Sequence, residues 1–329
     1  MELPNEELTG LEPALGGETP RLTGREPILG GSRRPEADMA RVQSLIGVAS
    51  PGERGRIITY IIQLGQAEAY ARELMLLVPL GARQKQSGWR GGVTLTQRCL
   101  AIEALGQLGG PDCLGVLLVA LADTTYQVRA AAEQALDQVC ARLDPTTPAA
   151  GKAISALVGA LASPSLAPRK VAARLLAGLP SDLVLGPLLR DGLGASDPRA
   201  RREAAWTLGR LRDRRATTRL VQRLSDPSAT VRAAAAWALG RLDAPAALKY
   251  LEELLGDPDE IVRAAAVDAY GALVGRLSTL DETFKPSLDR LASVLDTEVE
   301  LAVRTAVLDA LAGIDAAEAR VVLQGLLNR

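Results

Sequence analysis

Residues Asp226 to Leu242 read DPSATVRAAAAWALGRL, and this stretch decides the fold. It opens with Asp-Pro, a pair that is typical of a turn because proline cannot continue a preceding helix. Small or aliphatic residues then follow Arg232 at offsets of 3, 7 and 10, namely Ala235, Leu239 and Leu242. At about 100° per residue, these three positions share one narrow sector of a helix. The stretch therefore predicts a helix that begins after a turn and buries one stripe.

The same pattern recurs along the chain, and each copy begins with an arginine. Successive arginines from Arg98 onward lie 31, 40, 32, 31, 31 and 41 residues apart, and a weaker copy begins at Arg54. A period near 31 residues has the length of a helical hairpin. Aromatic residues are only 3% of the chain, so alanine and leucine must fill the core, which suits helices better than sheets. We therefore predict an all-α solenoid of about eight hairpins. The clear copies begin at Arg98, Arg129, Arg169, Arg201, Arg232, Arg263 and Arg304.

The segment ahead of each arginine supplies the other helix of the hairpin, as in Ala246 to Leu255. Asp-Pro separates the two helices at residues 197–198, 226–227 and 257–258, where the aspartate can cap the second helix. Three departures from regularity are two longer connections, around 144–151 and 275–286, and an insert at 81–92. We expect a bulge on the array at each of them.

The signature D-P-x-x-x-V-R-x-x-A-A-x-A-L-G-x-L, clearest at 226–242, resembles HEAT repeats of the phycobilisome-lyase type. The resemblance covers roughly residues 41–329. It implies an α-solenoid over 39–329. Residues 1–38 are rich in glycine, proline and glutamate and show no helical period, which predicts an extended or disordered tail. Such repeats serve as scaffolds, adaptors and regulatory subunits as well as lyases, so the resemblance is specific for fold and weak for function.

Composition excludes several classes of function. Histidine is absent, which removes the commonest general base and metal ligand, and we expect no catalytic residue, metal or cofactor. Three cysteines without metal or disulfide spacing favour packing roles in a reducing, cytoplasmic compartment. The apolar run at 74–80 is too short to span a bilayer. A net charge of −1 provides no overall attraction to nucleic acid or anionic lipid.

The acidic residue and the arginine that recur in the copies invite a functional interpretation. Asp226 with Arg232, and Asp257 with Arg263, hold identical places in successive copies. A catalytic group is rarely needed in every repeat of one protein. We expect a structural ladder of caps and hydrogen bonds that links neighbouring hairpins.

Offset 5 lies on the helix face opposite the buried stripe and should face outward into a groove formed by the second helices. The residues there change along the chain from Glu103 through Arg174 to Trp206 and Trp237, and then to Asp268 and Asp309. Arginines stand one turn after each tryptophan. Tryptophan and arginine most often anchor interfaces, which favours a binding patch, although the tryptophans can also be packing residues. The predicted partner-binding residues are Arg174, Arg202, Trp206, Arg210, Trp237 and Arg241.

The first 38 residues carry a tandem motif. Residues 8–17 read LTGLEPALGG and residues 22–31 read LTGREPILGG, so eight of the ten positions are identical in the two copies. A local duplication is one explanation, and a tandem docking motif for a dimeric or repetitive assembly is the other. The predicted docking residues are Leu8, Glu12, Pro13, Leu15, Leu22, Glu26, Pro27 and Leu29.

Three functions compete. The leading hypothesis is a non-enzymatic scaffold or adaptor, whose tail docks on a multi-subunit assembly while the groove binds a second protein. The family resemblance implies an alternative, a phycobilin lyase or chaperone-like factor for phycobiliproteins, with arginines such as Arg174, Arg210 and Arg241 holding propionates. A HEAT-like DNA glycosylase is the third, and the acidic neighbours Asp268 and Asp309 argue against its basic groove.

Overall fold

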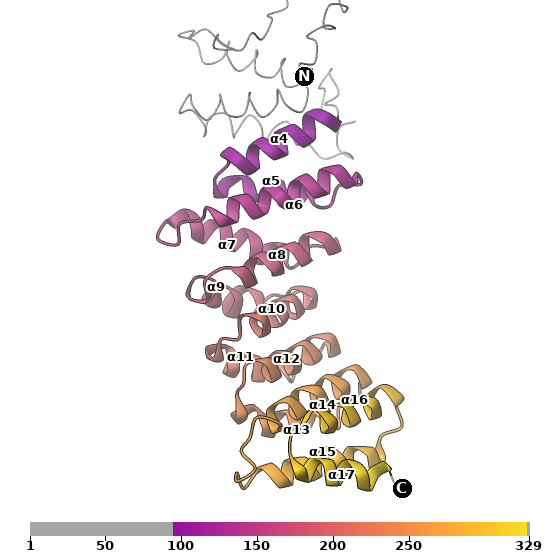
Figure 1. Cartoon of the computed structure of the whole chain (residues 1–329). Helices are drawn as coiled ribbons and strands as arrows, with labels where there is room; N and C mark the ends of the chain where they lie inside the picture. The colour runs from indigo at the N-terminus through magenta and orange to yellow at the C-terminus, as the bar shows by residue number, and fades with distance from the viewer. Residues whose placement is uncertain (1–94, 328–329) are drawn as a thin grey trace, which may run out of the picture. The chain divides into compact units, whose positions relative to one another are not determined.

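A computed structural model describes residues 95–327, and every element in that range is helical. The helices follow one another as antiparallel hairpins that stack in chain order (Figure 1). The predicted all-α solenoid is therefore confirmed for this range. The weaker copy at Arg54, the insert at 81–92 and the tail boundary at residue 38 lie outside the described residues.

Each complete hairpin pairs a first helix with a second helix, and in four of the six described hairpins the first α-helix has only seven residues. The first helices are α5 (Leu114–Ala120), α7 (Pro148–Ala160), α9 (Ser181–Pro187), α11 (Thr217–Arg223), α13 (Leu248–Leu254) and α15 (Phe284–Thr297). The second helices, which begin with the unpaired α4, are α4 (Leu95–Leu108), α6 (Tyr126–Ala141), α8 (Leu166–Gly178), α10 (Pro198–Leu211), α12 (Ala229–Arg241), α14 (Glu260–Val274) and α16 (Leu301–Gly313). A last helix, α17 (Ala317–Leu327), follows them.

The buried stripe predicted for the second helices forms the core between the two layers of helices. Ala235 and Leu239 are fully buried on α12, and Leu242 just after it is 1% exposed. The cysteines described there are packing residues, because burial raises the pKa of both Cys113 and Cys140 to about 11. No helix in residues 95–327 is long and apolar enough to cross a membrane.

Only one of the three Asp-Pro aspartates caps a helix. Asp197 accepts a hydrogen bond from the backbone N–H of Arg199 and is the N-cap of α10. Asp226 and Asp257 stand before the N-caps of α12 and α14, which are Ser228 and Asp259. The capping expectation is therefore wrong for these two. Their carboxylates have a different partner, which lies in the preceding hairpin.

That partner is the recurring arginine, and together they form the expected ladder. Arg201 donates from Nε and Nη2 to the Asp226 carboxylate at 2.8 Å each, 25 residues further on. Arg232 holds Asp257 with the same two bonds at 2.8 Å. Each arginine also donates Nη1 to backbone carbonyls of its own turn, such as that of Ala195 at 2.9 Å from Arg201. We call these pairs the arginine ladder. Its rungs are Arg98–Asp123, Arg201–Asp226, Arg232–Asp257 and Arg263–Glu298.

Two rungs are missing in the middle of the described range. The carboxylate positions that would pair with Arg129 and Arg169 hold Ser163 and Ala195. Arg169 is buried, its Nε has no hydrogen-bond partner, and the nearest carboxylate, that of Glu203, lies 3.9 Å away. The junctions between α6 and α8 and between α8 and α10 therefore lack the rung that the others have.

The glycine that allows neighbouring second helices to pack closely is also missing at these two junctions. A Cβ atom on Gly240 would lie 2.7 Å from the Cα atom of Ala269, so α12 and α14 pack tightly only because this residue is glycine. The equivalent residue of α6 is Asp137 and that of α8 is Ala177. Correspondingly, α6 and α8 approach one another over a much shorter stretch than α10 and α12 or α12 and α14.

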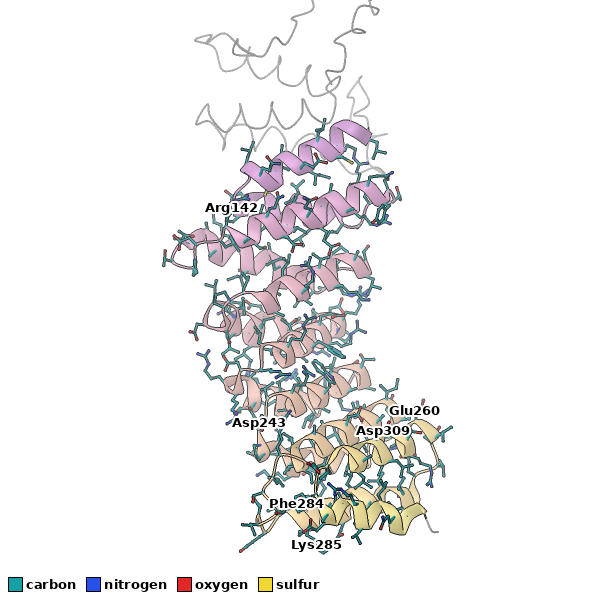
Figure 2. The ribbon with its side chains drawn as sticks, viewed as in Figure 1. Arg142, Asp243, Glu260, Phe284, Lys285 and Asp309 are labelled. Carbon is teal, nitrogen blue, oxygen red and sulfur yellow. The ribbon has the colours of Figure 1, made fainter. Side chains whose placement is uncertain are left out.

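The longer connections join α6 to α7 and α14 to α15. After the first, Thr147 is the N-cap of α7, whose first residue is Pro148. Arg142, labelled in Figure 2 at the end of α6, donates to the carbonyl oxygens of Gly106 at 2.6 Å and Gly109 at 3.1 Å. It thereby fastens the ends of α4 and α6 together.

Candidate functional site

The second helices from α4 to α16 lie side by side and form one layer of the solenoid (Figure 1). Offset 5 after each ladder arginine points away from the core, as predicted. Glu103, Trp206, Asp268 and Asp309 are exposed at this offset, and Trp237 is half-buried. This row of second helices is the surface on which the candidate residues lie.

Trp206 of α10 and Trp237 of α12 stack on each other in the middle of the row. Their ring centroids are 3.8 Å apart and the ring planes are inclined by 34°. Trp237 fits against α10 because Gly209 has no side chain, and a Cβ atom there would lie 2.6 Å from the indole of Trp237. Trp237 therefore serves partly as packing between repeats, whereas Trp206 keeps 40% of its surface exposed.

Two arginines flank this stack and lack an oxygen partner. The guanidinium carbon of Arg241 lies 5.2 Å from the ring centroid of Trp237, a cation–π distance. Arg210 is exposed beside Trp206, four residues further along the same helix. Among the arginines of residues 95–327, only these two and Arg212 neither hydrogen-bond nor ion-pair through the side chain with an oxygen atom.

Arg174 and Arg202, the other two predicted binding residues, are already engaged. Arg174 donates to the carboxylates of Asp137 at 2.8 Å and Glu133 at 3.0 Å, both on α6. Its hydrogen bond to Asp137 is the main cause that raises the pKa of Arg174. Arg202 ion-pairs with its neighbour Glu203 at 2.5 Å. Four of the six residues therefore have no carboxylate partner, and we call these four, Trp206, Arg210, Trp237 and Arg241, the Trp/Arg patch.

A cleft of about 450 Å³ lies between α14 and α16, next to the patch along the row. Asp268 on α14 lines it, as does Asp309 on α16, which is labelled in Figure 2. Partial burial, with the negative charge of Asp309, raises the pKa of Asp268. Arg276 lies on the rim and ion-pairs with Asp243 at 3.7 Å. We call this hollow the acidic cleft.

The sequence pointed to Asp268 and Asp309 as charges but not to the hollow between them. The available signal was offset 9 of these two helices, where Ala272 and Gly313 line the cleft, whereas four of the seven copies carry glutamine or arginine at that offset. Among residues 95–327, no three His, Cys, Asp or Glu side chains are placed to hold a metal ion. The surface presents guanidinium groups, an indole face and carboxylates, which together can hold a charged polypeptide.

The comparisons with known proteins agree with the repeat pattern. HEAT repeats match residues 186–271, and the PBS lyase HEAT-like repeat matches residues 97–123. No curated protein matches the sequence. Among solved structures, a chain in the structure of Kap95p with RanGDP is similar, with 15% identity, a TM-score of 0.52, and coverage of 88% of this chain and 43% of that one. This likeness shows the fold alone.

Two further structures are similar at lower TM-scores. The complex of CpcE and CpcF of phycocyanin lyase from Nostoc sp. PCC7120 has 22% identity and a TM-score of 0.36, covering 65% of this chain and 87% of that one. Human deoxyhypusine hydroxylase has 23% identity and a TM-score of 0.33, covering 75% and 93%. The hairpin period and the buried stripe of the described solenoid agree with these two matches, so residues 186–271 are similar to HEAT repeats and residues 97–123 to the PBS lyase HEAT-like repeat.

Proposed function

We propose that the chain is a non-enzymatic scaffold or adaptor whose row of second helices binds a protein partner at the Trp/Arg patch. The observation that carries this proposal is the exposed Trp206 between two arginines, Arg210 and Arg241, whose donors are unused. Tryptophan and arginine contribute much of the binding energy of protein interfaces. A guanidinium group that has no hydrogen-bond partner in the free protein loses no such bond when it binds another protein.

The charge order along the row sets the chemistry of that partner. Glu133 and Asp137 lie on one side of the patch, and Asp268 and Asp309 lie on the other. A partner with alternating charge complements this order, whereas a continuous polyanion such as DNA would meet carboxylates on both sides. The tandem motif of the tail would dock on a dimeric or repetitive assembly, so the chain would join two proteins.

The test begins with affinity purification of the full chain from its native cell and reconstitution of any stoichiometric partner from purified components. We expect Arg210→Gln with Arg241→Gln to weaken partner binding about tenfold or more, because both charged anchors are lost. Arg320→Gln removes an exposed arginine of α17 and should leave affinity unchanged. Equal binding by the patch variant and wild type would move the function away from this surface.

A lyase or chaperone-like role on phycobiliproteins is the second candidate. It is supported by the match of residues 97–123 to the PBS lyase HEAT-like repeat. On this alternative, Arg210 and Arg241 would hold the propionates of a bilin, while Arg174 is occupied by Glu133 and Asp137. Visible absorbance that stays with the purified chain and is lost in the patch variant would favour it.

A further inference from the structure

Ser163 occupies a position at which the arginine ladder elsewhere has a carboxylate. It is followed by a proline and lies six residues before a recurring arginine, as Asp226 is and does. The serine hydroxyl also makes the local hydrogen bond of the ladder aspartates. Ser163 Oγ accepts from the backbone N–H two residues later at 3.3 Å, and Asp226 Oδ1 accepts the equivalent bond at 3.0 Å. The serine therefore keeps the geometry of a rung but lacks its charge.

The arginine that this rung would engage is already oriented on α6. Arg129 Nη1 donates to the backbone carbonyl oxygens of Asp123 at 2.8 Å and Thr124 at 2.9 Å. Arg201 makes the same two Nη1 bonds within its own turn, and its Nε and Nη2 hold the carboxylate of the next hairpin. Nε and Nη2 of Arg129 make no hydrogen bond within the part of the chain that the structure describes. Arg129 is thus held as a ladder arginine with two donors unused.

A phosphate group on Ser163 would supply the missing charge. Phosphoserine carries a charge of about −1.5 to −2 at neutral pH, and arginine binds phosphate through two parallel N–H···O bonds. Phosphate extends further than a carboxylate and needs a more open junction. Ser163 is half-buried, whereas Asp226 is 4% exposed, and α6 and α8 lack the close glycine contact of the neighbouring junctions. The other missing rung has Ala195 in this place, which has no hydroxyl to modify.

The position of Ser163 makes it accessible to a modifying enzyme. It lies in the turn between α7, which ends at Ala160, and α8, which begins at Leu166. Pro164 is exposed, and Leu166 keeps 52% of its surface exposed. The backbone at Ser165 is extended, with φ −82° and ψ 140°. Surface turns of this kind are where modifying enzymes reach a chain, because their backbone is not fixed in a helix or sheet.

We propose that Ser163 is a phosphorylation site and that its phosphate pairs with Arg129, which completes the rung between α6 and α8. The donor is a nucleoside triphosphate held by a separate protein kinase. Ser163 Oγ forms a bond to the γ-phosphorus, and the bond from that phosphorus to the β,γ-bridging oxygen breaks. The nucleoside diphosphate leaves, and the hydroxyl proton passes to a base of the kinase. The proposal does not depend on binding at the Trp/Arg patch.

The phosphate would strengthen the junction that has the fewest other links. Without it, the exposed ion pairs of Arg174 with Glu133 and Asp137 join α6 to α8. Such pairs contribute little because water and salt screen them. A half-buried phosphate with two guanidinium hydrogen bonds is screened less. Phosphorylation would therefore change how firmly the hairpins before this junction are attached to those after it.

The first test compares full-length chains with and without phosphoserine at position 163, incorporated during translation. Thermal unfolding followed by circular dichroism should show a midpoint about 2–4 °C higher in the phosphorylated chain. The rise should be lost in Arg129→Gln, which removes the positive charge. Ser165→Asp is the matched control, because it adds a negative charge at the N-cap of α8 outside the ladder position. Its effect should be the same with and without Arg129.

Phosphorus NMR provides a second measurement, which does not depend on how stable each variant is. Free phosphoserine has a second pKa of about 6, and pairing with a guanidinium favours the dianion and lowers that value. The phosphate should therefore titrate below about pH 6 in the wild type and closer to 6 in Arg129→Gln. Arg129→Lys keeps the charge without the pair of donors and should lie between them. An identical titration midpoint in all three chains would overturn the pairing.

Mass spectrometry of the chain purified from its native cell tests whether the modification occurs. We expect phosphate on the peptide that contains Ser163, and we expect Ser163→Ala to remove it. Treatment of the native chain with a phosphatase should lower its unfolding midpoint by the same few degrees. A chain without phosphate at Ser163 in growing, starved and heat-stressed cells would refute the proposal. Partner binding at the Trp/Arg patch is measured separately, so either proposal can fail while the other stands.

Discussion

At the scale of single residues, glycine has opposite effects on the stability of the fold at different positions in the repeat array. Gly240 allows α12 and α14 to touch, since a Cβ atom there would meet the backbone of Ala269 at 2.7 Å. Gly151 lies in the first turns of α7 and has nothing within 4 Å of the place where a Cβ atom would stand. One glycine is required by packing, and the other carries only the entropy cost of a flexible residue in a helix.

We predict that Gly240→Ala and Gly151→Ala change stability in opposite directions. The first should lower the free energy of unfolding by about 1–3 kcal/mol, because an added methyl group forces two helix backbones apart. The second should raise it by about 0.5–1 kcal/mol, because alanine loses less backbone freedom on folding. Urea unfolding followed by circular dichroism measures both, and equal effects of the two substitutions would refute the packing argument.

At the scale of the helical elements, most junctions between second helices combine an arginine–carboxylate pair with a close glycine contact. Two junctions lack both of these features. Between α10 and α12, a buried bidentate pair and a glycine contact act together. Between α6 and α8, neither is present, and the exposed ion pairs of Arg174 with Glu133 and Asp137 take their place. Exposed pairs are screened by salt and contribute little, so this junction has the weaker link.

Restoring one missing rung should therefore stabilise the array. Ala195→Asp places a carboxylate where Arg169 has a buried Nε without a hydrogen-bond partner. We expect a gain of about 1 kcal/mol, because the charge-assisted hydrogen bond to the buried Arg169 exceeds the cost of desolvating the new carboxylate. The midpoint of thermal unfolding should rise, and the double variant Arg169→Gln with Ala195→Asp should show no rise. A rise that persists without Arg169 would contradict the proposed pairing.

At the scale of the whole molecule, the arginine ladder makes the free energy of unfolding depend on pH. Burial is the largest single influence on Asp123, Asp226 and Asp257 and would raise the pKa of each. Hydrogen bonds from the ladder arginines and from nearby backbone N–H groups, together with the positive charge of the arginines, outweigh burial and lower these pKa values overall. For Glu298, the hydrogen bond from Arg263 is the main cause of its lowered pKa. A carboxyl group with a lowered folded-state pKa stabilises the fold above its unfolded value and loses that contribution as pH falls through the folded one.

We accordingly predict a nearly constant ladder contribution between pH 7 and about 5, and a progressive loss below about pH 4, where carboxylates of unfolded chains take up protons. Thermal unfolding at a series of pH values measures this. Asp257→Asn removes one titrating rung, so its melting temperature should be lower at neutral pH and fall less steeply in acid. An identical acid slope in wild type and variant would show that the ladder does not titrate in this way.

The sequence by itself determined the helices, their hairpin period and the stripe that each buries, because these depend on local spacing of about 3.6 residues per turn. It also identified the recurring arginine and carboxylate as structural, and it singled out the residues of the Trp/Arg patch. It did not indicate that Arg201 pairs with Asp226 of the next hairpin, because that depends on how far apart two helix axes lie.

Tertiary structure alone decided which candidate groups are available for binding. Arg174 at offset 5 and Arg210 at offset 9 look equivalent in the sequence as charges on the outer helix face. In the structure, Arg174 is held by two carboxylates of α6, whereas Arg210 is unpaired. The stacking of Trp206 on Trp237 depends on the lack of a side chain at Gly209, on the neighbouring helix. Side-chain availability is set by contacts between helices, and periodicity within one helix carries no information about them.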